Sequence, residues 1–468
     1  MAEKEPVLPP PGPGLLLSLE PGRGPLHEQL ELSLREQVRT GRLAPGSRVP
    51  SSRALAAELG ISRGVVLEAY GQLVAEGYFL ARQGAPTRVA GGQLAELPPL
   101  AAGWLEPRYH YRFDPSLPDL GSFPRDRWLR SLRTALRQAP FDALGHGDPR
   151  GVPELRNALM GYLGRARGAA PEPEHTLICA GFTQGFALIC ACLHERGVER
   201  IAIEDPGWAR HRLVAERSGL EAVPIPVDEQ GLDVSGLAAS GCEAVVVTPA
   251  HQFPTGVVMS SERRAGLLAW ADDVAGLIVE DDYDSELRYD RGPVGALQGL
   301  APERVCHVGS VSKRLLPSLR LGWMLCPSWL TGELTFAKGI SDGGSPAVDQ
   351  LALSDFITRG ELDRHLRRMR IRYRDRRAMA EAALTAALPE AKLAGVAAGL
   401  YTLVLLPAGG SEPAASRAAA AAGVWVEGLS SHQVLARDQV GFILGYANVS
   451  EPAFKRGVAL LGAAVTSP

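Results

Sequence analysis

Five short apolar segments alternate with stretches of helical periodicity in the second part of the chain, and this alternation restricts the folds open to it. Runs of three to five residues containing valine and isoleucine, separated by helical spacers, predict βαβ units and a mainly parallel sheet buried on both faces. The segments are residues 175–179, 200–203, 244–247, 277–279 and 305–308. In such sheets ligands bind beyond the carboxyl ends of the strands. Polar residues directly after these segments are therefore the first candidates for a functional site.

The stretch after the last segment, residues 309–325, places Ser310 and Ser312 just before Lys313 and Arg320 seven residues after it. A protonated lysine amine is a poor nucleophile, but desolvation or a neighbouring positive charge allows it to hold a carbonyl compound as a Schiff base. Arg320 could then bind a dianionic group of the same ligand. A solvated loop is the alternative explanation for this stretch taken alone.

The pattern SxSK followed by LRLG resembles the cofactor-lysine region of fold-type I enzymes that use pyridoxal phosphate. The resemblance implies that Lys313 forms the Schiff base with pyridoxal 5'-phosphate. It also implies that Ser310, Ser312 and Arg320 lie near the phosphate group.

Motifs after the other segments suit the same cofactor. A glycine-flanked turn leads into a helix at Phe182 and Thr183, whose backbone N–H groups would point at an anion. Trp208 stands where an aromatic ring could stack on the cofactor, and Arg210 is a possible clamp for a carboxylate.

The fourth segment is followed by acidic and aromatic residues. Asp281, a carboxylate at the end of a buried strand, can keep a pyridine nitrogen protonated, and Tyr283 can donate to the phenolic oxygen of the ring. Each residue has a simpler alternative: Trp208 as a core anchor, Asp281 as a helix cap and Thr183 as a turn former. Their order along the chain, as one fold requires it, favours the cofactor site.

Length and composition restrict the class of protein. A chain of 468 residues is too long for one compact core, so two or more domains are expected. The net charge of -3 means that any basic surface must be local. The six cysteines form no CxxC pair and no zinc-ligand spacing, which predicts reduced thiols and no metal site. Without a signal-peptide pattern or a membrane-length apolar run, we expect a soluble cytoplasmic protein.

Residues 15–90 predict a mainly helical DNA-binding domain. The first helix is expected over residues 26–40, the second begins at Ser51 or Ser52 and ends at Gly60, and the third begins at Ser62. A tight turn between two short helices is typical of a helix-turn-helix, whose second helix enters the major groove. The stretch after the third helix predicts a two-stranded wing with Gly84 at its tip.

LAPGSRVPSSRALAAELGISRGVVLEAYGQLVAEGY is similar over its full length to the winged helix-turn-helix domain of GntR-type repressors. The resemblance implies contacts with an operator in double-stranded DNA. The residues expected to make them are Ser51, Arg53, Ser62, Arg63, Gly64 and Gly84. Residues 21–90 hold nine arginines against six glutamates, a small excess that favours a dimer on two half-sites. A helical protein-interaction module is the alternative.

The remaining chain completes the resemblance. Residues 91–110 lack a sustained period and contain glycines and a proline pair, which is typical of a linker. Residues 111–468 resemble an α/β aminotransferase of class I, fold type I. Both domains together resemble the MocR family of pyridoxal-phosphate-dependent transcription regulators. In related folds the cofactor site lies at a dimer interface, so a homodimer is implied.

Two positions depart from the aminotransferase pattern. Phe253 stands where an asparagine normally precedes the PTG turn and bonds the ring oxygen, so Gln252 could replace that bond or the bond is lost. Residues 441–454 lack the arginine that binds a substrate carboxylate in such enzymes. Arg210 is the main substitute for it, with Arg437 second.

Three functions follow from the resemblance. The first is a regulator that senses an amine or amino acid through aldimine exchange at Lys313. The second is a regulator for which pyridoxal phosphate itself is the effector. The third is an aminotransferase with an accessory DNA-binding domain, which the missing arginine disfavours; residual half-transamination is compatible with either regulator.

Overall fold

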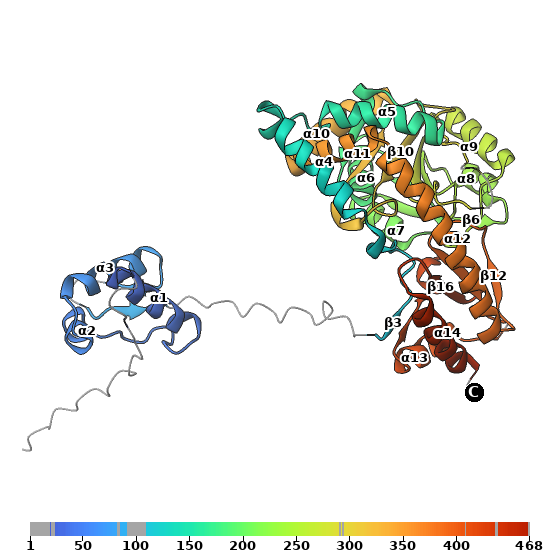
Figure 1. The fold of residues 1–468 in the computed structure, drawn as a ribbon. Coiled ribbons are helices and arrows are strands. Elements are labelled where there is room, and N and C mark those ends of the chain that lie inside the picture. Colours follow the sequence, from blue (N-terminus) through green and yellow to red (C-terminus); the bar gives the residue numbers. More distant parts are fainter. Residues whose placement is uncertain are drawn as a thin grey trace, which may run out of the picture. The chain divides into compact units, whose positions relative to one another are not determined.

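A computed structural model describes residues 19, 24–81, 85–90, 109–289, 292, 294–407, 409–435 and 439–466. The chain divides into two compact units, Met1–Pro107 and Arg108–Pro468. We call them the DNA-binding unit and the cofactor unit, and Figure 1 shows both as ribbons.

The DNA-binding unit contains three helices and a small wing. The helices are α1 (Leu26–Arg39), α2 (Ser52–Leu59) and α3 (Arg63–Ala75). Strands β1 (Phe79–Leu80) and β2 (Arg88–Val89) pair antiparallel, which confirms the predicted two-stranded wing. Gly84, the predicted wing tip, lies outside the described residues.

Local sequence explains where the helices of this unit begin and end. Ser51 caps α2 by accepting from the Ala54 N–H at 3.2 Å, and Ser62 caps α3 through the Val65 N–H at 3.4 Å. Gly60 ends α2 in the left-handed region, with φ 64°.

The cofactor unit is built on an eight-stranded sheet in the order β4-β11-β10-β9-β8-β5-β6-β7. Neighbours from β10 to β6 pair in parallel, which confirms the predicted mainly parallel sheet, while β11 is antiparallel to both β4 and β10. The strands are β4 (Thr176–Cys179), β5 (Arg200–Asp205), β6 (Glu221–Asp228), β7 (Gly231–Leu232), β8 (Ala244–Val247), β9 (Leu277–Asp282), β10 (Val305–Ser310) and β11 (Gly322–Leu325). The sequence prediction missed β6, β7 and β11.

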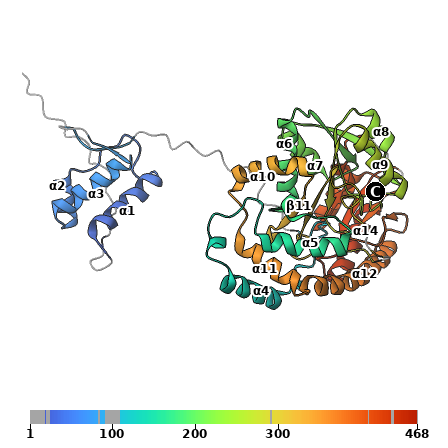
Figure 2. The ribbon, with the colours of Figure 1, turned by 90° about the horizontal axis from the view of Figure 1, so that it is seen from above.

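Helices cover both faces of this sheet (Figures 1 and 2). Ala244 and Val246 pack into one apolar cluster, whereas Val245 and Val247, which alternate with them, pack into another. Successive side chains of a strand point to opposite faces, so β8 is buried on both sides. The helices around the sheet are α4 (Arg125–Gln138), α5 (Pro153–Arg167), α6 (Phe182–Glu195), α7 (Ala209–Arg217), α8 (Val234–Ala239), α9 (Ser261–Asp273), α10 (Ser328–Asp342), α11 (Ala347–Thr358) and α12 (Glu361–Ala387).

A second, four-stranded sheet lies in the C-terminal part, in the order β12-β13-β16-β15. Its strands are β12 (Lys392–Ala394), β13 (Tyr401–Leu405), β15 (Glu427–Gly428) and β16 (Gly441–Gly445), and helices α13 (Glu412–Ala421) and α14 (Glu451–Thr466) accompany it. β14 (Val424–Trp425) pairs in parallel with β3 (Tyr111–Arg112), so the start of the unit joins its C-terminal part.

Two further expectations concern cysteines and membranes. The six cysteines are free and buried, as predicted for reduced core thiols. None of the helices in the described ranges combines the length and the apolar character needed to cross a bilayer.

Gly309→Ala should destabilise the cofactor unit. An added Cβ would lie 2.6 Å from Nε1 of Trp323 on the paired strand β11, and both positions are fixed by the register. Overpacking of this kind typically costs about 1–3 kcal/mol, measurable as a lower midpoint in urea unfolding. Gly332→Ala in α10 is the control, because nothing lies within 4 Å of its added Cβ; equal midpoints for both variants would contradict the expected clash.

Candidate functional site

A cavity of about 570 Å³ opens at the carboxyl ends of the central strands. It brings together ten of the residues predicted from sequence. These are Phe182, Thr183, Trp208, Arg210, Asp281, Tyr283, Ser310, Ser312, Lys313 and Arg320. Strand ends far apart in sequence thus contribute to one site, as the parallel topology predicts.

Lys313 follows β10 and lies in the wall of the cavity. Its Nζ donates a hydrogen bond to the carbonyl of Ser116. Withdrawal from solvent lowers the pKa of Lys313, although Asp114, Asp284 and Asp281 act in the opposite direction. A lower pKa increases the fraction of unprotonated amine, which is the form that attacks a carbonyl carbon.

Asp281 places a buried carboxylate in the cavity wall. Its Oδ2 lies 3.1 Å from Nε2 of His211, whereas Oδ1 has no hydrogen-bond partner among the described residues. Burial raises the pKa of Asp281, and the contact with His211 opposes that shift. Because an unpaired buried oxygen is costly, Oδ1 marks a position for an N–H group of a ligand.

The start of α6 and Arg320 together form an anion-binding corner. Gly181 precedes the helix with φ 94° and no side chain caps the first turn, so backbone N–H groups at Phe182 remain available. The guanidinium of Arg320 donates to the carbonyl of Ala180, and its Nη2 lies 3.3 Å from the position of a Cβ on Gly181. A side chain at Gly181 would therefore crowd the arginine.

Trp208 and Arg210 lie at the start of α7. The half-buried Trp208 ring contacts Phe182 and His211, with centroids 6.0 and 5.3 Å apart. Arg210 is exposed, and its Cζ lies 5.3 Å from the centre of the Trp208 ring. Within the described ranges no carboxylate forms an ion pair with Arg210, so its guanidinium is available to a ligand.

Tyr283 lines the cavity, but its hydroxyl is already engaged. It donates to the carbonyl of His251 at 2.8 Å and lies 3.2 Å from the hydroxyl of Tyr401. The predicted donation to a ring oxygen would compete with these contacts.

Gln252 does not line the cavity, where it would have to lie to replace the bond of the asparagine to the ring oxygen. Its amide nitrogen donates to Glu204, and to the carbonyl of Pro206 at 2.8 Å, while its oxygen accepts from the hydroxyl of Thr255. These contacts hold the turn before the PTG sequence. Phe253 lines the cavity instead, and it cannot form the bond that asparagine makes in aminotransferases.

The sequence prediction missed several residues of the cavity wall, most of them far from the predicted strand ends. These are Arg112, Asp114, Pro115, Ser116, Thr248, Pro317, Trp425 and Glu427. Trp425 and Glu427 belong to two-residue strands, which are too short to show a periodic pattern. Arg437, the second candidate for binding a carboxylate, lies outside the described residues.

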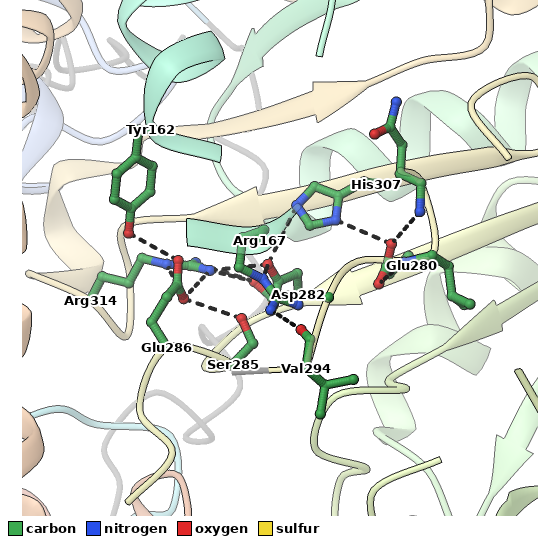
Figure 3. Close-up of polar contacts among 12 residues, drawn as sticks. Tyr162, Arg167, Glu280, Asp282, Ser285, Glu286, Val294, His307 and Arg314 are labelled. Carbon is green, nitrogen blue, oxygen red and sulfur yellow. Dashed lines mark hydrogen bonds and ion pairs between the residues drawn. The ribbon is translucent and has the colours of Figure 1, made fainter. Parts of the chain in front are cut away.

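A buried ion cluster joins Asp282 of β9 and His307 of β10 with Arg167, Glu286 and Arg314 (Figure 3). Asp282 accepts from Nε of Arg167 at 2.9 Å and lies 3.3 Å from Nη2 of Arg314. Arg314 also reaches Glu286 at 2.6 Å, and His307 lies 3.4 Å from Asp282. All five side chains are buried, so their charges interact with little screening.

The same cluster bonds the backbone next to the cavity residues. Nη1 of Arg314 donates to the carbonyl of Ser310 at 2.6 Å, and its guanidinium donates to the carbonyl of Asp282 at 3.2 Å. Lys313 directly precedes Arg314 in the sequence, and Asp281 directly precedes Asp282. The cluster therefore fixes the backbone that carries the lysine and the carboxylate.

The predicted DNA contacts lie on exposed positions of α2 and α3. Arg53 and Gly64 are exposed, and the Nε of Arg63 donates to Oγ of Ser52 at 3.3 Å. Ser51 and Ser62 keep their hydroxyls at the helix starts as caps. The N-terminal end of α3 thus presents Arg63 beside two capped helix N-termini, an arrangement suited to phosphate.

The donor set of the cavity fits pyridoxal phosphate. The corner at Arg320 suits a phosphate, the unpaired Oδ1 of Asp281 suits a protonated ring nitrogen, and the amine of Lys313 suits an aldehyde. The three groups are chemically different, as are the three parts of the cofactor.

Two family models match the chain. The model "Aminotransferase class I and II" matches residues 123–452, and "Bacterial regulatory proteins, gntR family" matches residues 26–89. The chain also resembles the solved structure of Pyrococcus horikoshii kynurenine aminotransferase, with a TM-score of 0.70 and 24% identity over 77% of this chain and 91% of that one. At that identity the likeness shows the fold, which confirms the predicted fold-type I architecture.

Curated relatives are similar over most of this chain. The HTH-type pyridoxine biosynthesis transcriptional regulator PdxR of Corynebacterium glutamicum is 33% identical over 81% of this chain and 82% of its own. The probable rhizopine catabolism regulatory protein MocR of Rhizobium meliloti is 31% identical over 93% of this chain and 92% of its own.

Asp282→Asn should destabilise the cofactor unit at neutral pH. Burial alone would raise the pKa of Asp282, but Arg167 and Arg314 outweigh it and hold this pKa well below its usual range. Breaking a buried pair costs about 3–5 kcal/mol. Because the folded pKa is depressed, this stability is fully present above the unfolded pKa of about 3.9 and is lost as pH falls through the folded pKa.

Urea unfolding at several pH values would measure this contribution. The gap between wild type and Asp282→Asn should be widest near neutral pH and should narrow below about pH 4. Asp272→Asn is the matched control, because Asp272 pairs with Arg304 on the surface at 3.0 Å and should matter little. A gap that stays constant with pH would contradict the role of the charge.

Proposed function

The chain belongs to the MocR-type transcription regulators, in which a GntR-family domain precedes an aminotransferase-like domain, and we propose that it controls transcription by sensing an amine or amino acid at Lys313. It binds pyridoxal 5'-phosphate in the cofactor unit and DNA through its GntR domain. The observation that carries the proposal is the convergence of Lys313, the free oxygen of Asp281 and the Arg320 corner in one cavity.

Each of these residues has a defined task toward the cofactor. Arg320 and the start of α6 would hold the phosphate, and Asp281, oriented by His211, would accept a hydrogen bond from the ring nitrogen. When bound, pyridoxal phosphate supplies an aldehyde carbon that binds primary amines covalently and reversibly. Lys313 would hold this carbon in the resting protein, and its lowered pKa favours the reactive amine.

An effector amine that takes the place of Lys313 would free the lysine to recover a positive charge beside Asp114 and the Ser116 carbonyl. That change in charge gives the two states of the cavity different energies. A ligand shifts the protein between two arrangements only by its difference in affinity for them.

We propose a homodimer as the DNA-binding form. Large apolar side chains are exposed on α4, the 3-10 helix η3 (Asp142–Leu144) and α10, which a second copy could cover. They are Leu136, Phe141, Leu144, Phe336 and Ile340. Two GntR domains would also double a weak electrostatic contact with DNA.

We place the DNA-binding domain at residues 15–90, the linker at 91–110 and the cofactor domain at 111–468. The GntR match ends at residue 89 and β3 begins at Tyr111, which supports these boundaries. As a regulator of chromosomal DNA, the protein would act in the cytoplasm.

Experiments can distinguish two alternative functions from amine sensing. Pyridoxal phosphate itself could be the effector, an idea supported by the relative named for pyridoxine biosynthesis. An aminotransferase is supported by the shared fold, but Phe253 in the cavity disfavours it, as does the absence of an arginine in the described segment 441–454. Titration of the cofactor-loaded protein with amines, while following its binding to DNA upstream of its own gene, distinguishes the three functions. Only an amine sensor changes its DNA affinity when the amine is added. Only an aminotransferase turns over a keto acid repeatedly.

Lys313→Ala should abolish covalent attachment of the cofactor and any response of DNA binding to amines. Borohydride reduction followed by mass spectrometry would find the adduct on the wild-type peptide and none on the variant. Lys392→Ala, an exposed lysine of β12, is the control and should retain the adduct. An unmodified Lys313 peptide from cofactor-saturated wild type would refute the assignment.

Arg63→Ala should weaken operator binding by about 1–3 kcal/mol, because it removes a cation at the start of the recognition helix. The visible spectrum of the bound cofactor should stay unchanged. Arg39→Ala serves as the control, since Arg39 is an exposed arginine at the end of α1 paired with Glu36. Equal losses of DNA affinity in both variants would mean that net charge alone, and not this position, binds DNA.

A further inference from the structure

Glu427 is an acidic residue of the cavity that the cofactor does not require. It lies in β15, lines the cavity and is half-buried. Its Oε1 lies 3.0 Å from Nε2 of His432. In the described part of the chain no hydrogen bond is made by its Oε2 and no lysine or arginine forms an ion pair with it.

The partner of Glu427 carries no compensating charge. The backbone N–H of Ala209 donates to Nδ1 of His432 at 3.3 Å, so Nδ1 must be an acceptor. The imidazole is then neutral, with its proton on Nε2, and it donates to Glu427. The carboxylate of Glu427 therefore lines the cavity without an ion pair to a lysine or arginine of the described residues. It acts on Lys313, but less than Asp114, Asp284 and Asp281 do.

Charge matching across the cavity leaves two groups without a counterpart. Arg112 lies 3.6 Å from Asp114, and the cofactor accounts for Asp281 and Arg320. Lys313, once the effector frees it, lies against the Ser116 carbonyl with Asp114 as the strongest charge acting on it. Of the charged lining residues this leaves one cation, Arg210, and one anion, Glu427. A ligand that satisfies both needs a carboxylate and an ammonium group, in addition to the amine directed at the Lys313 position.

We infer that the effector is a diamino carboxylic acid, whose carboxylate binds Arg210 and whose second ammonium group binds Glu427. This inference rests on the proposed amine-sensing function and adds the class of the effector. Trp208 and Trp425 line the same cavity, and both rings can pack against the aliphatic part of such a ligand. A half-buried charge such as that of Glu427 disfavours ligands that leave it unpaired.

A purely structural role for Glu427 makes a different prediction. As a support for His432, the residue needs only an acceptor oxygen, and glutamine supplies one in the same place. Glu427→Gln thus keeps the hydrogen bond to His432 and removes the charge. Any effect confined to ligands with a second ammonium group then reports the charge itself.

The test compares L-lysine with L-norleucine, which has a similar chain but lacks the second amine. Calorimetric titration of the full-length, cofactor-loaded protein should show L-lysine binding at least about tenfold more tightly, as expected for a charged hydrogen bond. Glu427→Gln should remove this preference and leave the affinity for L-norleucine unchanged. Glu390→Gln, an exposed carboxylate outside the cavity, should behave as wild type.

The outcomes distinguish a failure of this inference from a failure of the proposed amine-sensing function. If L-norleucine binds as tightly as L-lysine, or if Glu427→Gln keeps the preference, the diamino assignment is wrong while amine sensing stands. If neither amino acid binds although the cofactor spectrum is intact, amine sensing fails together with it. Cadaverine, which lacks the carboxylate, should bind more weakly than L-lysine; equal binding would overturn the role of Arg210.

Discussion

The buried ion pairs of Asp282 with Arg167 and Arg314 are the constraint on which the cofactor site depends. They lie at the end of β9, one residue after Asp281, and Arg314 is the residue after Lys313. Because a buried charge without its partner is costly, these side chains admit few alternative positions. These ion pairs therefore hold the backbone of the lysine and of the ring-binding carboxylate, while the Nζ of Lys313 and the Oδ1 of Asp281 take no part in them.

Sequence alone predicted the parts of the fold whose signals are local. The apolar segments marked β4, β5, β8, β9 and β10, and Ser51, Ser62 and Gly60 marked helix ends. Residues directly after those strands line the cavity because parallel topology brings strand ends together. β11 was missed because its four residues were interpreted only as the end of the motif that carries Lys313 and Arg320.

The parts that sequence could not supply depend on contacts between distant segments. The hydroxyl of Tyr283 is directed by His251 and by Tyr401, which is 118 residues away. Gln252 is withdrawn from the cavity by Glu204 and Thr255. Glu427 reaches the cavity only because β15 pairs with β16 in the second sheet. None of these arrangements leaves a period or a motif in the chain.

The C-terminal segment that carries Glu427 also forms hydrogen bonds with the end of β5 and the loop after it. Asp205 accepts from the backbone N–H groups of Val434 and Leu435 at 2.7 and 3.2 Å, and Gly207 donates to the carbonyl of His432 at 2.9 Å. Each such bond contributes about 1 kcal/mol net, which is comparable to one ligand contact. A ligand that binds Glu427 would therefore contact the same segment that these hydrogen bonds hold to the end of β5 and the loop after it.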